Sequence, residues 1–62
     1  PICAIGVADS GGLHGAAILG RRAAGVGELA HIYADGSSHA YTLLYGSAWR
    51  TLKAMGYEQT VL

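Results

Sequence analysis

The chain has 62 residues, of which four are basic and four acidic, so its formal net charge is zero at pH 7. A chain of this length forms one small domain at most, here 1–62, and buries only ~60% of its unfolded surface. The balanced charge argues against nucleic-acid binding, and a single cysteine excludes an internal disulfide. No apolar run approaches the ~20 residues that cross a bilayer. These features predict a cytoplasmic protein that binds neither nucleic acid nor membrane.

The N-terminal third of the chain predicts a β-hairpin. Apolar, strand-like runs cover 2–8 and 13–20, and the intervening Asp9-Ser-Gly-Gly12 is dense in residues that adopt turn conformations. Polar and apolar residues do not alternate cleanly in either run, which predicts that both faces of these strands are covered. A glycine-rich connection then leads to a third strand, predicted over 28–33.

One long amphipathic helix is predicted over 39–55. Apolar residues at three- and four-residue spacing form its stripe, namely Tyr41, Leu44, Tyr45, Ala48, Leu52 and Met55. We expect Leu44, Ala48 and Leu52 to point toward the sheet. A mid-helix glycine costs ~1 kcal/mol relative to alanine, so Gly46 predicts the close approach of a ligand or of another helix.

The ends of the helix carry recognisable signals. Ser37 or Ser38 is predicted as the N-cap, because its hydroxyl can accept a hydrogen bond from a free amide of the first turn. Gly56 is the residue type that ends a helix in a left-handed conformation. A last strand is predicted over 58–62, parallel to the third strand. The expected fold class is therefore α+β, with an antiparallel hairpin plus a third strand, one long helix and a final parallel strand.

The loop that enters the helix is a candidate anion site. A strand that feeds a helix through a short polar loop directs free N–H groups to one point, and the helix dipole adds partial positive charge there. The residues at this point are Ser37, Ser38, His39, Ala40 and Tyr41. The alternatives are that the serines only cap the helix and that His39 is an ordinary surface residue.

The run GELAHIYADGSSHAYTLLYGSAWRTLKAMGY, 27–57, resembles the core of small GNAT-type N-acetyltransferases of phages and mobile elements. GAAILGRRAAG, 15–25, resembles the strand and loop ahead of that core. The resemblance implies that the loop before the helix binds the pyrophosphate of acetyl-CoA and that the pantetheine arm runs between the third and last strands. Two departures are visible: Ser37 and His39 stand where the superfamily uses glycines, and the family's domain is longer at both ends.

Two residues are candidates for a general base acting on an amine acceptor. Acetyltransferases of this fold often place a carboxylate near the position of Glu28, where it takes a proton from the amine, usually through water, before attack on the thioester. His31 is the second candidate, because imidazole exchanges protons near neutral pH. The alternatives are a solvated strand-end carboxylate and a core or interface histidine. No spacing of histidines and cysteine predicts a metal site.

Two other functions are compatible with the sequence. A trimmed acetyltransferase core could serve as a non-catalytic binding module or inhibitor, and an uncovered apolar sheet face predicts a homo-oligomer or a protein partner. Pro1 followed by a strand superficially resembles the small tautomerases whose N-terminal proline is the catalytic base. That family places a long helix after its first strand, and the glycine-rich stretch 9–27 cannot form one.

Overall fold

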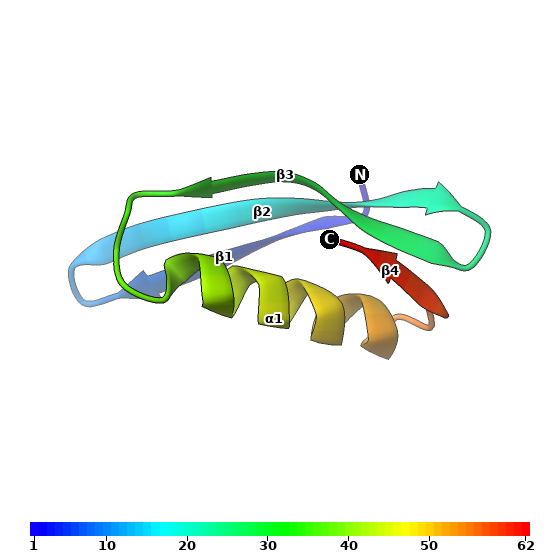
Figure 1. Ribbon diagram of the computed structural model, residues 1–62. Coiled ribbons are helices and arrows are strands. Elements are labelled where there is room, and N and C mark those ends of the chain that lie inside the picture. The colour runs from blue at the N-terminus through cyan, green and yellow to red at the C-terminus, as the bar shows by residue number, and fades with distance from the viewer.

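The computed structural model describes residues 1–62 and contains four strands and one helix in the order β1–β2–β3–α1–β4 (Figure 1). The elements are β1 Cys3–Asp9, β2 Gly12–Ala23, β3 Val26–Ala34, α1 Ala40–Ala54 and β4 Gln59–Val61. One mixed sheet has the strand order β1-β2-β3-β4, with the first three strands antiparallel and β4 parallel to β3. The predicted α+β class and element order are confirmed. The stretch after β1 is a strand, so the tautomerase topology is excluded.

The helix covers one face of the sheet, and the core lies between the two layers (Figure 1). Leu44, Ala48 and Leu52 of α1 are fully buried, which confirms the predicted inward positions. They pack over β2, where Leu19 is also fully buried. The apolar stripe is narrower than predicted, because three of its members are 40–50% exposed, namely Tyr41, Tyr45 and Met55.

Two glycines allow the helix to lie directly on the sheet. A Cβ added to Gly15 would lie 2.8 Å from the carbonyl oxygen of Tyr33 and 2.9 Å from Cδ1 of Leu44. A Cβ added to Gly27 would lie 2.7 Å from Cδ2 of Leu52. The start and the end of α1 therefore each place a leucine against a position that has no side chain. At Gly46 an added Cβ would meet only the side chain of Arg50. No other element of this chain therefore approaches the helix closely at Gly46, and the predicted approach of a ligand stays a prediction.

The helix begins differently from the prediction and ends as predicted. Neither serine caps it: the N-cap is His39, in a left-handed conformation with φ 69°, and no side chain bonds a first-turn amide. At the other end Gly56 has φ 95° and donates to the carbonyl of Lys53, while Tyr57 donates to that of Leu52. This pair of bonds is a Schellman motif, which satisfies carbonyls that the last helical turn leaves free.

The sheet has three register shifts, one of them between Arg21 and Ala23, and the other two re-aim side chains near the candidate site residues. Between β1 and β2, Val7 pairs with Gly15 and Ala8 with Leu13, so His14 is the extra residue. A bulge of this kind bends the strand and re-aims a side chain. Between β2 and β3, Ile18 pairs with His31 and Leu19 with Leu29, which leaves Ala30 as the extra residue.

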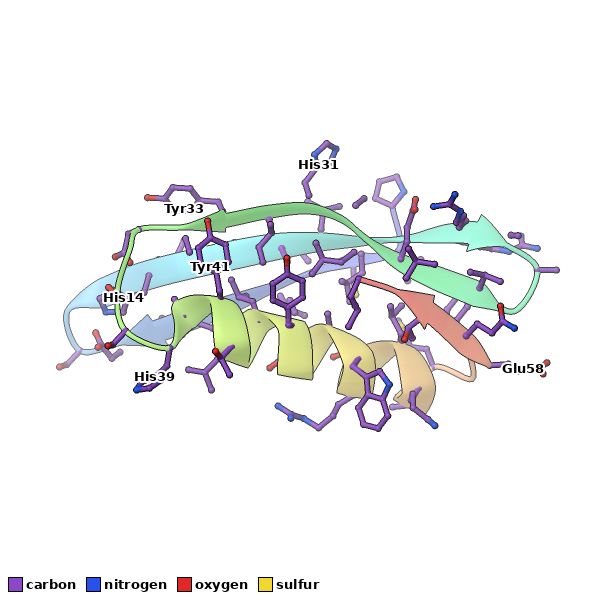
Figure 2. All side chains as sticks on the ribbon, in the orientation of Figure 1. His14, His31, Tyr33, His39, Tyr41 and Glu58 are labelled. Carbon is purple, nitrogen blue, oxygen red and sulfur yellow. The ribbon has the colours of Figure 1, made fainter.

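The sheet face opposite α1 is uncovered. Figure 2 shows His31 and Tyr33 pointing away from the helix, and Leu13 and Tyr33 are about 60% exposed. No element of this chain covers that face, so the prediction that both faces of the hairpin strands are covered requires a second molecule and stays a prediction. The glycines and alanines of 2–20 are compatible with an exposed face because they present little apolar surface.

The helix α1 is too short and too polar to cross a membrane.

Candidate functional site

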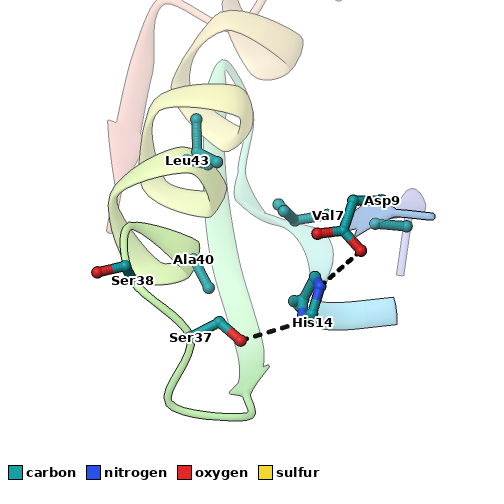
Figure 3. A pocket seen from close by; sticks show the side chains of 8 residues that line it. Val7, Asp9, His14, Ser37, Ser38, Ala40 and Leu43 are labelled. Atoms are coloured by element: carbon teal, nitrogen blue, oxygen red, sulfur yellow. Dashed lines mark hydrogen bonds and ion pairs between the residues drawn. The ribbon is translucent and has the colours of Figure 1, made fainter. Parts of the chain in front are cut away.

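One end of the sheet gathers the turn after β1, the start of β2, the end of β3 and the first turn of α1. A pocket of about 300 Å³ opens there, on the β1 side of the helix (Figure 3). Its polar lining residues are Asp9, His14, Ser37 and Ser38, and its apolar ones are Val7, Ala8, Ala40 and Leu43. The pocket thus brings the predicted loop residues Ser37 and Ser38 together with two side chains of the N-terminal hairpin, Asp9 and His14.

The centre of this region is the imidazole of His14, which the bulge in β2 turns toward the loop. Its Nε2 lies 2.9 Å from Oδ1 of Asp9, and its Nδ1 lies 2.9 Å from Oδ2 of Asp35 and 3.0 Å from Oγ of Ser37. Both carboxylates are held in turn by backbone: the Gly11 N–H donates to Asp9 and the Ser37 N–H donates to Asp35. One ring therefore links the β1–β2 turn to the loop before α1.

The charges of this cluster stabilise one another. Hydrogen bonds to Asp35 and Asp9 raise the pKa of His14 above its usual 6.5. Hydrogen bonds from the side chain of Ser37 and from His14 lower the pKa of Asp35 to about 2, and the bonds from His14 and the Gly11 amide lower that of Asp9. When His14 is protonated, the cluster is one imidazolium between two carboxylates, with a net charge of −1.

This arrangement contains a serine, a histidine and an aspartate, but in its protonated form the ring cannot activate the serine. A serine nucleophile needs a neutral imidazole nitrogen that can accept its proton. Each ring nitrogen of His14 faces a carboxylate, so a protonated ring donates to Asp9 and Asp35 and has no lone pair for Ser37. No group of histidine, cysteine and carboxylate side chains in the chain is placed to hold a metal ion.

Four backbone N–H groups at the start of the helix have no hydrogen-bond partner in the chain, those of Ser38, His39, Tyr41 and Thr42. Of the five amides predicted to hold a pyrophosphate, two are already used: Ser37 donates to Asp35, and Ala40 donates to the carbonyl of Ser37 at 3.2 Å. The first turn also carries no acidic side chain. Because free amides and the positive end of the helix dipole coincide here, the turn suits an anion.

The pocket itself does not suit a phosphate, because the carboxylate of Asp9 lines it. The β3 side of the helix is different. Leu43 lines the pocket on the β1 side, so Tyr41 and Tyr45, on the opposite flank of α1, lie toward β3. Figure 2 shows Tyr41 extending from the first turn in that direction.

The neighbouring edge of β3 is free over most of its length. β4 pairs only with Val26, Gly27 and Glu28, so the edge from Leu29 to Ala34 has no strand beside it. An unpaired edge presents backbone N–H and C=O groups to any extended ligand. This edge runs about 16 Å, at ~3.3 Å per residue, from the end of β4 to the loop before α1.

The two predicted base residues lie together, away from the pocket. Their partners in β2 are Gly20 for Glu28 and Ile18 for His31, two residues apart, so both side chains are on the sheet face opposite α1. The bulge at Ala30 produces this, because a spacing of three would otherwise place them on opposite faces. An oxygen of Glu28 also lies 3.7 Å from the guanidinium of Arg22.

Sequence reasoning missed the two residues that organise the site. Asp9 was interpreted only as a turn residue, and His14 received no role. The predicted topology contained the signal. In an antiparallel sheet the end of the first strand near 8, the start of the second near 13 and the end of the third near 33 lie at the same end of the sheet. A histidine and two aspartates at those ends are expected to meet.

Comparisons of this chain with known protein families, with curated proteins and with solved structures found no match.

The charge cluster makes stability depend on pH. Because the folded pKa values of Asp35 and Asp9 are lowered, their contribution is present above about pH 4 and is lost as the pH falls, toward about 2 for Asp35. The folded pKa of His14 is raised, so its contribution to the free energy of unfolding is complete below pH 6.5. This contribution is lost as the pH rises through the pKa that His14 has in the folded protein. We expect the urea midpoint to be highest between about pH 4 and 6.5. A midpoint that increases from pH 6 to pH 8.5 would contradict this assignment.

Proposed function

We propose that this chain is a GNAT-like acetyltransferase core that binds acetyl-CoA along the free edge of β3, with its pyrophosphate at the first turn of α1. The observation that carries the proposal is the junction of two features. The unpaired edge Leu29–Ala34 leads directly to the free amides of the first turn. An extended chain with amide groups and a terminal diphosphate, which is the chemistry of pantetheine joined to pyrophosphate, can engage both at once.

In this proposal, acetyl-CoA is bound by both polar and apolar groups of the chain. Amides of Ser38, His39, Tyr41 and Thr42 would donate to the phosphates. A helix terminus contributes only ~0.3–1 kcal/mol per charge at an exposed site, so most of the affinity comes from the β3 edge and the rings of Tyr41 and Tyr45. The side chains of Ser37 and His39 narrow the approach to the backbone relative to glycines. Ser37 itself is held by His14 and Asp35 and is not free to donate.

Acyl transfer would occur near the point where β4 leaves the edge of β3. The thioester would lie beside Leu29, which is next to Glu28 and two residues from His31 in β3. Both of these side chains are on the face opposite α1. Either side chain could take the proton of an amine that approaches from that face. The amine nitrogen would form the new bond to the acetyl carbon, and the CoA thiolate would leave with the electron pair of the C–S bond.

A second function is favoured by a different observation. Glu28 lies near Arg22, and the face that carries both is open and includes the exposed side chains of Leu13 and Tyr33. An open face of this kind fits a partner protein or a second copy of the chain. In that case the chain is a non-catalytic binding module or inhibitor. CoA binding without acetyl transfer to any amine would favour this second function.

The cofactor site is tested by replacing Thr42 with glutamate. Thr42 is exposed and is the third residue of α1, where a carboxylate can accept from the free amide of the N-cap residue, His39. The substitution should stabilise the fold by ~0.3–1 kcal/mol through the helix dipole. It should also weaken CoA binding at least tenfold in calorimetry, because it places a negative charge among the phosphate-binding amides.

The matched control is Thr42→Gln, which has the same shape and no charge. It should retain CoA binding within a few fold. If Thr42→Glu is folded and binds CoA as tightly as Thr42→Gln, the phosphates do not lie at the start of α1 and the proposal is wrong.

A further inference from the structure

The charge cluster at His14 holds the loop that presents the free amides. The loop, 35–39, is anchored through Asp35, whose two oxygens take the Ser37 N–H and the ring of His14. It then enters the helix through His39 in a left-handed conformation, which is uncommon for a residue other than glycine. A non-glycine residue persists in this conformation only where its surroundings impose it. The side-chain contacts of Asp35 and Ser37 hold the loop immediately before this residue.

We propose that His14 is a positioning residue, which in its protonated form locks the loop 35–39 and thereby orients the anion-binding amides of α1. The link is direct, since one ring contacts Asp9 at 2.9 Å, Asp35 at 2.9 Å and Ser37 at 3.0 Å. No other charged group faces it: the carboxylates come from the end of β1 and from the loop, and α1 contributes only Ala40 and Leu43 to this pocket.

Loss of the proton changes the cluster in two ways that act together. A neutral imidazole carries one N–H, so either Asp9 or Asp35 then faces a ring lone pair and loses its hydrogen bond. At the same time the charge of the cluster changes from −1 to −2, close to the amides that would receive a phosphate. Both effects disfavour an anion at the start of α1. The shared network also raises the pKa of His14, so the change falls above pH 6.5.

The ligand part of this inference rests on the proposed function, whereas the loop part does not. The loop part is tested first, on the unmodified chain, by following backbone amides and histidine rings by NMR between pH 5.5 and 9. The amides of Ser37, His39 and Tyr41 should titrate with the midpoint of the His14 ring. If they do not follow that midpoint, His14 does not position the loop.

The ligand part is tested with CoA as the probe at pH 6 and pH 8.5. Binding to the unmodified chain should weaken at least about fivefold at the higher pH, a typical size for coupling between sites. In His14→Gln the difference should disappear, because ionisation of CoA itself affects both proteins equally. Asp9→Asn, which keeps a neutral hydrogen-bond partner for the ring, serves as a second variant if His14→Gln does not fold.

The outcomes separate the two proposals. Loop amides that follow His14 while CoA binds equally at both pH values would overturn the control of binding by His14. No CoA binding at either pH would overturn the proposed function and the control of ligand binding with it, and the amide titration would still decide whether His14 positions the loop.

Discussion

Leu44→Ala should remove most of the stability of this protein. Leu44 is fully buried and lies over Gly15 of β2, where an added Cβ would be only 2.9 Å from its Cδ1. Truncation of a buried leucine costs ~2–5 kcal/mol, and a domain of this size is stabilised by only about 3–9 kcal/mol in total. The expected result is a large decrease in the urea midpoint or a chain that is unfolded in buffer, measured by circular dichroism.

The adjacent residue provides the matched control. Leu43 is 48% exposed on the same helical turn, so Leu43→Ala removes the same atoms with little change in burial. It should shift the free energy of unfolding by less than about 1 kcal/mol. Equal losses from the two substitutions would mean that α1 does not present Leu44 to the sheet.

Gly15→Ala should also be strongly destabilising, because it adds a methyl group where the core has no room for one. The new methyl group would lie 2.8 Å from a backbone oxygen of Tyr33 and 2.9 Å from Leu44, so strand and helix must move apart. Overpacking of this kind costs ~1–3 kcal/mol. The measurement is the free energy of unfolding from urea titration.

The control for this change lies on the same strand. At Gly20 an added Cβ would meet its nearest neighbour, Glu28, at 3.8 Å, an ordinary contact distance. Gly20→Ala should therefore be neutral or stabilising by ~0.4–1 kcal/mol, since alanine restricts the unfolded chain. A Gly15→Ala variant as stable as Gly20→Ala would show that the helix does not lie as close to β2 as the structure places it.

The sequence was sufficient for the elements and their order because those depend on local patterns. The spacing of Leu44, Ala48 and Leu52 predicted both the helix and its inward face, and Gly56 predicted how it ends. The N-cap prediction was wrong because the decisive partner is distant in sequence. Ser37 is engaged by His14, 23 residues earlier, so it is not free to cap α1.

The functional site was predictable only in part for the same reason. The loop before α1 was found, since a strand–loop–helix junction is visible in the sequence. The cluster that holds it depends on a bulge at His14, which no local pattern marks. The bulge at Ala30 likewise places Glu28 and His31 on one face, whereas their spacing in an unbroken strand would separate them.

The measurement that tests the central claim most directly is a titration of the unmodified chain with CoA, followed by amide chemical shifts. We expect the largest changes at the free amides at the start of the helix and along the unpaired edge of β3, with little change in β1. The free amides are those of Ser38, His39, Tyr41 and Thr42, and the edge runs from Leu29 to Ala34. Saturable changes confined to those two segments would support acetyl-CoA binding at the junction. The absence of any saturable change, or changes centred on the pocket beside Asp9, would contradict it.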